Sequence, residues 1–323
     1  MTTPRFLSGI QPSGELHLGN YFGAMLQHLA NQEAGNSFYF IANYHALTTI
    51  QDTDVLRRST FDVAASYLAM GLDPARATLF RQSDVPEVTE LTWLLLTVTP
   101  MGLLERAVSY KDKVARGLPA SAGLFTYPAL MAADILAYDS NVVPVGADQV
   151  QHIEIARDMA GAFNRTFDRE VFVLPEARLN AARIVPGVDG QKMSKSYGNG
   201  IPMFLSGKAL RKRVMSIVTD STPVEDPKDP ERCTVFQLYA LFADDAERAA
   251  LAARYRDGGM GYGEAKQALL AKIEERFADG RARRAELDAD PSYVEDVLHA
   301  GAAQARAAAR VTLDRARAAC GVA

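Results

Sequence analysis

The chain has few cysteines, no excess of basic residues and no long apolar run, and each shortage narrows the classes of protein to consider. Its two cysteines, Cys233 and Cys320, lie far apart and match no Cys-x-x-Cys spacing. A disulfide framework is thereby excluded, and neither zinc nor an iron–sulfur cluster is indicated. We expect no metal held by protein side chains.

Apolar and basic residues are spread along the chain. No apolar run is long enough to cross a bilayer, and the opening Met-Thr-Thr-Pro-Arg-Phe has no signal-peptide core, so we expect a cytoplasmic protein without a membrane anchor. The formal net charge is −4, which means that any RNA contact has to use a local basic patch. With 48% hydrophobic and 23% charged residues over 323 positions, the chain suits one large or two moderate globular domains.

One short loop concentrates positive charge and hydroxyl groups. The sequence Gln-Lys-Met-Ser-Lys-Ser-Tyr-Gly-Asn at 191–199 sets Lys192 and Lys195 three residues apart, so a turn or 3₁₀ geometry aims both ammonium groups the same way. Lysine and serine donors together can follow negative charge as it moves onto a leaving group. The loop therefore favours a phosphate site, although a solvated basic loop is an equally ordinary interpretation.

A second segment near the amino terminus has a complementary pattern. The sequence Ser-Gly-Ile-Gln-Pro-Ser-Gly at 8–14 is typical of a strand entering a tight turn, and a helix opens after it. Free amides at such a helix start suit an anion, and Gly19 lets a nucleotide approach the backbone. His17 and Asn20 lie three apart in the first helical turn and point the same way, but a lone polar pair is more often a helix cap.

Strand and helix patterns alternate over the first half of the chain. Compact apolar runs predict buried parallel strands at 37–42, 77–82 and 141–145, with a helix over 54–70 that ends at Gly71. This alternation indicates a doubly wound α/β sheet. His45 follows one strand at its carboxyl end, where such sheets bind ligands, but a structural histidine is about as frequent there.

Together the two segments resemble the paired signatures of class I aminoacyl-tRNA synthetases, namely His-Leu-Gly-Asn at 17–20 and Lys-Met-Ser-Lys-Ser at 192–196. The preceding Ser-Gly-Ile-Gln-Pro-Ser-Gly is similar to the tryptophanyl branch, in which the asparagine is usual. The resemblance implies a Rossmann-type α/β fold in a catalytic domain at 1–205. It also implies that the loop Tyr-Lys-Asp-Lys at 110–113 closes over ATP phosphates.

The resemblance assigns roles to individual residues. It implies catalytic positions at Lys192, Lys195, Lys113 and Gln11, and an ATP site formed by Gln11, Pro12, Ser13, His17, Gly19, Asn20, Gly146, Ala147, Asp148, Ile184, Lys192, Met193, Ser194, Lys195 and Ser196. Alternatives remain from the residues themselves, because Asp148 also suits a helix N-cap and Lys113 a solvated charge run. The family often carries Asp-Pro-Asn after the second signature, where this chain has Tyr197-Gly198-Asn199.

The segment 126–136 is expected to choose the amino acid. Asp134 lies among apolar neighbours, and a buried acceptor needs a donor. Tyr127 and Met131 precede it at a spacing that can set all three on one helical face. The resemblance implies that Asp134 accepts a hydrogen bond from the indole N–H of the substrate. It also implies tryptophan-binding roles for Tyr127, Met131, Gln149 and His45. A helix cap or a buried salt bridge is the competing interpretation of Asp134.

Residues 206–323 lack a strand signal and are rich in alanine, arginine, leucine and glutamate, which predicts an all-helical C-terminal domain. Its basic residues could meet tRNA phosphates on the anticodon side, or they could be the wet faces of amphipathic helices. The apolar stretch 88–108 suits either a core helix or, by resemblance, a homodimer interface.

The implied reaction is the activation of L-tryptophan by ATP, with Mg²⁺ carried on the phosphates, followed by transfer to tRNA(Trp). Two rivals remain open: a tyrosyl enzyme or related nucleotidyl transferase, and a paralogue that no longer charges tRNA.

Overall fold

A five-stranded parallel sheet forms the centre of the first half of the chain. The computed structural model describes residues 5–34, 36–107, 110–111, 121–140, 142–145, 150–179 and 184–323. The strand order is β3-β2-β1-β4-β5, and the strands are β1 Phe6–Ile10, β2 Ser37–Ile41, β3 Ala77–Arg81, β4 Val142–Val145 and β5 Glu176–Leu179. The order reverses between β1 and β4, and open α/β sheets bind their ligands at the carboxyl ends of the strands beside such a reversal.

The expected doubly wound sheet is confirmed, and one strand was missed. Every residue of β2 is buried, as its apolar run predicts. The sequence Glu-Ala-Arg-Leu of β5 contains two charged residues and no apolar run, so no strand was predicted there. It pairs with β4 at the sheet edge, where a short polar strand can keep one side in water.

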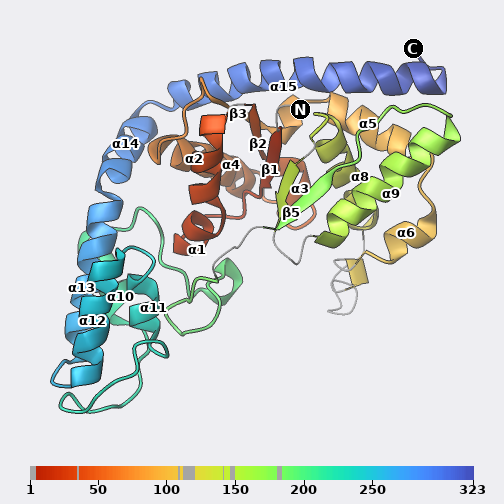
Figure 1. The fold of residues 1–323 in the computed structure, drawn as a ribbon. Coiled ribbons are helices and arrows are strands. Elements are labelled where there is room, and N and C mark those ends of the chain that lie inside the picture. The colour runs from red at the N-terminus through yellow and green to blue at the C-terminus, as the bar shows by residue number, and fades with distance from the viewer. Residues whose placement is uncertain are drawn as a thin grey trace.

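Helices cover both faces of this sheet (Figure 1). The predicted helix at 54–70 is α4, which begins after Asp52, whose carboxylate accepts from the backbone N–H groups of Asp54 and Val55. It ends at Ala69, two residues before Gly71, whose φ of +98° favours glycine. The helices of this half are α1 Leu18–Asn20, a π-type turn Tyr21–Met25, α2 Leu26–Asn31, α3 Asn43–Ala46, α4 Thr53–Ala69, α5 Glu87–Leu96, α6 Met101–Glu105, α8 Ala122–Leu136 and α9 Val150–Thr166.

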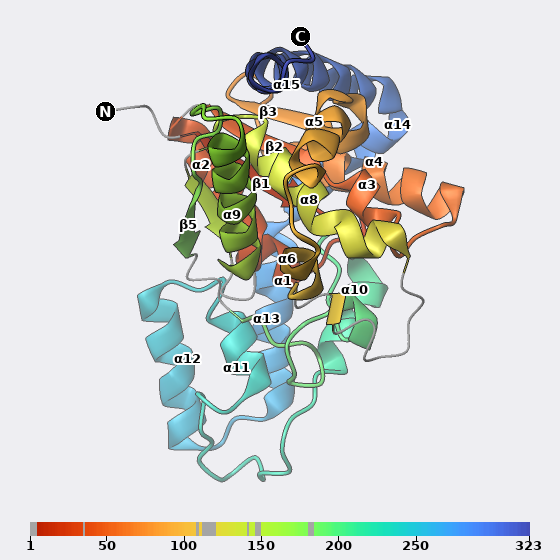
Figure 2. The ribbon, with the colours of Figure 1, turned by 90° about the vertical axis from the view of Figure 1, so that its right-hand side faces the viewer.

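Residues 206–323, all of which are described, form helices and connecting turns and contain no strand. The fold class predicted from the sequence is therefore confirmed. The first of these helices gather at one end of the molecule, and the chain then runs back from them toward the sheet (Figures 1 and 2). They are α10 Gly207–Met215, α11 Thr234–Tyr239, α12 Asp245–Asp257, α13 Tyr262–Arg276, α14 Ala278–Ala289 and α15 Pro291–Cys320.

The last helix returns to the sheet. Figure 1 shows α15 running along the molecule above β3 and α5. A Cβ on Gly301 of α15 would lie 2.0 Å from the carbonyl oxygen of Leu79 in β3, so only glycine permits this approach. Arg306 and Arg310 of α15 each lie 3.1 Å from the buried carboxylate of Glu87 in α5. The carboxyl-terminal helix thus packs on the half of the chain that carries the sheet.

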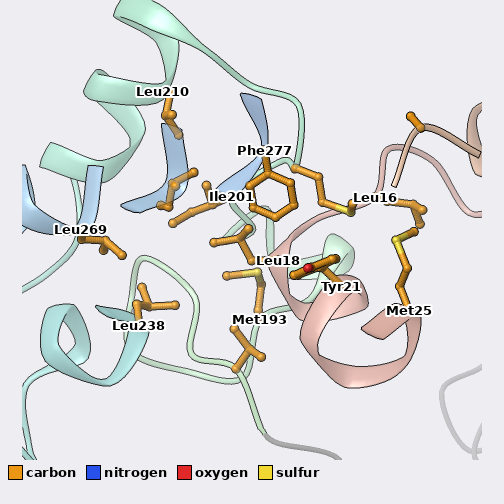
Figure 3. Packing of buried hydrophobic residues seen from close by; sticks show 14 of the residues in the cluster. Leu16, Leu18, Tyr21, Met25, Met193, Ile201, Leu210, Leu238, Leu269 and Phe277 are labelled. Atoms are coloured by element: carbon orange, nitrogen blue, oxygen red, sulfur yellow. The ribbon is translucent and has the colours of Figure 1, made fainter. Parts of the chain in front are cut away.

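One apolar cluster joins the two signature segments to the helical region. Figure 3 shows side chains of the segment after β1 and of the 192–203 segment packed with helical-region side chains. Its labelled members are Leu16, Leu18, Tyr21, Met25, Met193, Ile201, Leu210, Leu238, Leu269 and Phe277. Because this cluster contains residues from all three parts, their relative positions are set by shared core packing. No helix in the described ranges has the length and apolar character needed to span a membrane.

Candidate active site

The turn after β1 begins the site at the carboxyl edge of the sheet. Gln11 is exposed, and its backbone carbonyl accepts a hydrogen bond from the backbone N–H of Ser13 at 3.0 Å. Gly14 has a φ of +107°, a conformation that favours glycine, and Pro12 is buried. The turn is therefore a tight, supported loop that presents Gln11 and Ser13 to the crevice side of the sheet.

The Lys-Met-Ser-Lys-Ser segment lies directly against this turn. The backbone N–H of Leu18 donates to Ile201 O at 3.0 Å, and that of Met203 donates to Leu16 O at 3.0 Å. The Lys195 ammonium donates to Gly14 O at 2.7 Å and to Ser13 Oγ at 3.2 Å. Two segments about 180 positions apart in sequence therefore meet at one place, as their shared signature predicts.

The side chain of Met193 packs into the core and so fixes the second segment to it. Its side chain is 5% exposed and lies beside Leu18 in the core shown in Figure 3. The backbone N–H of Gly19 points at its sulfur at 3.2 Å, and a Cβ on Gly19 would lie 2.9 Å from the His17 ring. The space beside Gly19 is therefore filled by protein, and any contact of Met193 with a nucleotide falls to its backbone.

Asn199 organises the loop from within. Its Oδ1 accepts from the backbone N–H of Ser194 at 2.8 Å, and its amide donates to Asp189 Oδ1 at 2.8 Å and to Lys192 O at 3.2 Å. Gly198, at a φ of +62°, ends the 3₁₀ turn Lys195–Tyr197. This buried asparagine therefore links residues of the loop whose own side chains face water.

The two signature lysines have different surroundings. The side chain of Lys192 is exposed, whereas Lys195 is partly buried. Burial lowers the pKa of Lys195, and the nearby carboxylates of Asp62 and Glu15 oppose that shift. Burial raises the pKa of Glu15, with Asp62 adding to the effect. Arg284 of α14 bonds Asp62 at 2.8 Å, so the helical region contributes one charge to this cluster.

His17 and Asn20 contact each other at the start of the first helix. Asn20 Oδ1 accepts from the backbone N–H of His17 at 3.1 Å, which is the helix-cap interpretation. The His17 ring is 7% exposed, and its Nδ1 has no hydrogen-bond partner among the described residues. Burial and the neighbouring Lys195 lower the pKa of His17 to about 4, so the ring is neutral at pH 7.

A second polar group lies between α3, β3 and α8. Asp134 is 2% exposed, and its Oδ2 lies 2.7 Å from His45 Nε2. The amide of Gln82 donates to both Asp134 oxygens at 2.8 Å. Burial raises the pKa of Asp134, while His45 and then Gln82 oppose the shift. The carboxylate is buried as predicted, and its contact with His45 is of the kind that the competing buried-salt-bridge interpretation requires.

The ring of Tyr127 lies beside His45, which contacts this carboxylate. Tyr127 and Met131 share α8 with Asp134, and the Tyr127 ring meets the His45 ring edge-on with centroids 6.1 Å apart. The Tyr127 hydroxyl lies 2.7 Å from His152 Nε2 of α9. A hollow of about 300 Å³ adjoins His45 and Tyr127.

A larger hollow, about 1020 Å³, lies between α4 and α15 and only touches the signature turn at Gly14 and Glu15. Its size does not make it the site, because the two signature segments meet outside it, at the contact of Lys195 with Ser13 and Gly14.

The remaining predicted residues fall into two groups. Ile184 is 75% exposed, and the Ser194 and Ser196 hydroxyls lie 2.8 Å apart. The positions Lys113, Gly146, Ala147, Asp148 and Gln149 lie outside the described residues. Gln82 and Asn199 were missed as site residues. Position alone could have found Gln82, since it follows a buried strand at the ligand edge.

The fold and site define a nucleotide-binding α/β protein in which a strand–turn–helix signature and a lysine-rich loop face one crevice. The family model described as tRNA synthetases class I (W and Y) matches residues 2–278. This chain belongs to that family.

Relatives of nearly equal length give the finer comparison. A tryptophan–tRNA ligase of Rhodopirellula baltica is 59% identical over 319 residues, covering 98% of this chain and 99% of the relative. The solved structure of Campylobacter jejuni tryptophanyl-tRNA synthetase, complexed with ADP and tryptophan, has a TM-score of 0.93 and 50% identity over 98% of this chain and 99% of that one. A tyrosyl-tRNA synthetase of Archaeoglobus fulgidus, at 21% identity and a TM-score of 0.65 over 87% and 90%, shares the fold.

Proposed function

We propose that this chain is a tryptophan–tRNA ligase, which activates L-tryptophan with ATP and transfers it to tRNA(Trp). The observation that carries the proposal is the meeting of the two signature segments, with Lys195 2.7 Å from Gly14 O, in a chain 59% identical to a tryptophan–tRNA ligase over almost its whole length. A shared crevice of this kind suits a substrate that has to be held at both its nucleoside and its phosphate end.

The first step is an in-line displacement. The tryptophan carboxylate attacks the α-phosphate of ATP, pyrophosphate leaves, and tryptophanyl-adenylate remains. No side chain acts as nucleophile, so the protein supplies positioning and charge. In the proposal, Gln11, Ser13 and His17 hold the nucleotide, while Lys192, Lys195 and Lys113 meet the charge that develops on pyrophosphate.

The geometry suits this division of labour. The Lys195 ammonium is already held by a carbonyl and a hydroxyl at the signature turn, which a phosphate oxygen can replace at little cost in hydrogen bonds. Mg²⁺ shares the phosphate charge and is carried on ATP. Within the described ranges, no group of three or more His, Cys, Asp or Glu side chains is placed to hold a metal ion.

The amino-acid pocket selects an indole. Asp134 is a buried acceptor in contact with His45, whose ring meets that of Tyr127, and an indole N–H is a donor with no acceptor capacity. A ligand without that N–H leaves the remaining acceptor position of the carboxylate unfilled, so phenylalanine is rejected. Met131 is proposed to line the slot, and Gln149 to bind the α-amino group. In the second step a hydroxyl of the terminal tRNA ribose takes the acyl group, with the 2′-hydroxyl favoured.

Assembly and location complete the proposal. Trp93 of α5 is 68% exposed and Met101 of α6 is 61% exposed, and two large apolar side chains in water favour a partner surface. We propose that this surface joins two copies in a homodimer. We further propose that 1–205 is the catalytic domain, that 206–323 meets the anticodon side of tRNA, and that the enzyme works in the cytoplasm.

Amino-acid-dependent exchange of labelled pyrophosphate into ATP tests the proposal. We expect exchange with tryptophan at least about a hundredfold faster than with tyrosine or phenylalanine at equal concentration. Faster exchange with tyrosine would favour the tyrosyl rival. No exchange with any amino acid would favour a paralogue without ligase activity.

A further inference from the structure

Gln82 occupies a position that connects three elements of the amino-acid pocket. It follows β3 at the carboxyl edge of the sheet and is 1% exposed. Its side-chain carbonyl accepts from the backbone N–H of Tyr44 at 3.1 Å and of His45 at 3.4 Å, at the start of α3. Its amide nitrogen donates to Asp134 of α8. Every polar atom of this buried side chain therefore has a defined partner.

These contacts fix which end of the carboxamide faces Asp134. The two ends of a glutamine amide look alike in shape, so their assignment depends on the hydrogen-bond network. The Tyr44 backbone group can only donate, which requires the carbonyl end at α3 and leaves the N–H end for the carboxylate. The NH₂ group of Gln82 therefore donates toward Asp134, and a rotation of the carboxamide by 180° would break its hydrogen bonds to α3.

The donor has two consequences for Asp134. It stabilises the carboxylate in a buried place where charge is costly, and it opposes the rise in the pKa of Asp134 that burial causes. It also holds the orientation of the carboxylate. His45 occupies a lone pair of Oδ2, and Gln82 lies between the two oxygens, so Oδ1 keeps open acceptor capacity.

Charge and orientation together decide what the pocket accepts. An ionised carboxylate accepts hydrogen bonds only, whereas a protonated one presents a hydroxyl that competes as a donor. A charged acceptor also makes a stronger bond to an N–H than a neutral one does. We propose that Gln82 is a specificity-determining positioning residue, which keeps Asp134 as an oriented acceptor for the indole N–H and so sets the preference for tryptophan. This inference rests on the proposed function.

The experiment compares tryptophan with its benzothiophene analogue, β-(3-benzothienyl)alanine, in which sulfur replaces the indole N–H. Pyrophosphate exchange is measured with both amino acids for the wild type and for Gln82→Met, which keeps an unbranched side chain of similar length. We expect kcat/KM for tryptophan to fall about 10- to 100-fold, mainly through KM, because a hydrogen bond to a charged group is weakened in the ground and transition states alike. The analogue should change less than about threefold.

Gln32 provides a matched control. It is also a buried glutamine, and its side chain bonds two backbone groups, with Nε2 donating to Gly71 O at 3.1 Å and Oε1 accepting from Asp73 N at 2.8 Å. Gln32→Met should lower the melting temperature about as much as Gln82→Met while leaving the tryptophan-to-analogue ratio unchanged. Gln82→Asn, which keeps a polar group but is too short to reach both partners, supplies a second variant that should lower the same ratio.

The outcomes separate the two proposals. A ratio of kcat/KM values that falls about tenfold or more in the Gln82 variants alone supports the inference. A ratio that stays within about threefold of wild type, whether both amino acids lose activity together or neither does, overturns it and leaves Gln82 a structural residue. Absence of tryptophan-dependent exchange in the wild type overturns the proposed function, and this inference with it.

Discussion

Replacement of Lys195 by methionine should slow adenylate formation far more than it destabilises the protein. The Lys195 ammonium bonds Gly14 O at 2.7 Å and Ser13 Oγ at 3.2 Å, and burial lowers its pKa. The two bonds and the cost of removing the ammonium from water largely offset each other. We therefore expect the free energy of unfolding to change by about 1 kcal/mol or less.

The effect on the barrier is of a different size. Removing one preorganised donor from a site of developing charge costs about 3 kcal/mol, which is a factor of roughly a hundred or more in rate. Single-turnover measurement of adenylate formation, at saturating ATP and tryptophan, gives this factor directly. Tryptophan binding by calorimetry should change less than about threefold, because Lys195 lies at the phosphate end of the crevice.

Lys208 of α10 offers a matched control, since it is an exposed lysine on the next helix. Lys208→Met removes the same charge and should leave the rate of adenylate formation within about twofold of wild type. A Lys195→Met enzyme that forms adenylate within about threefold of the wild-type rate would refute the role assigned to the ammonium. So would a loss of rate that is matched by an equal loss of tryptophan affinity.

Three further predictions concern the pocket, the packing of α15 and the response to acid. Asp134→Asn should reduce the preference for tryptophan over phenylalanine in pyrophosphate exchange by about 10- to 100-fold, and an unchanged preference would contradict its role. Gly301→Ala forces a Cβ against Leu79 O and should lower the free energy of unfolding by about 1–3 kcal/mol. Gly263→Ala, with open space around it, should be neutral or slightly stabilising. Equal effects of the two variants in denaturant titrations would argue against the packing of α15. Burial lowers the pKa of His28 from 6.5 to about 4, so the ring is neutral in both the folded and the unfolded chain above pH 6.5. Below that pH the unfolded chain takes up a proton first, and the free energy of unfolding falls. Between pH 7 and 4.5 the wild type should lose about 2 kcal/mol more of this free energy than His28→Gln, and equal losses in the two proteins would refute the prediction.

The sheet and the convergence of the two signature segments could be predicted from the sequence. The buried run of β2 is apolar throughout, and a strand of this kind needs no knowledge of its neighbours to be recognised. The strand β5 could not be predicted, because its four residues acquire their structure from pairing with β4 and not from their own propensity. The return of α15 to β3 likewise depends on one glycine, Gly301, whose need appears only when both backbones are placed.

The site divides in a similar way. Sequence placed Asp134, Tyr127 and His45 in one pocket, and the structure brings these three together. The helix-cap contact between Asn20 and the His17 backbone was one of the two interpretations that the sequence left open. The sequence did not predict Gln82, which is 52 positions from Asp134 and carries no local signal beyond the end of a strand. Side-chain partners of this kind follow from tertiary packing, which local patterns do not contain.

A charging assay with purified tRNA(Trp) tests the central claim most directly. The claim is that one crevice, formed by the signature turn and the loop bearing Lys195, joins tryptophan to ATP and then to tRNA. The account predicts that the wild-type chain forms tryptophanyl-tRNA in the presence of ATP, Mg²⁺ and tryptophan, and that phenylalanine and tyrosine are not transferred. Transfer of tyrosine in preference to tryptophan, or no transfer from a chain that binds both substrates, would contradict it.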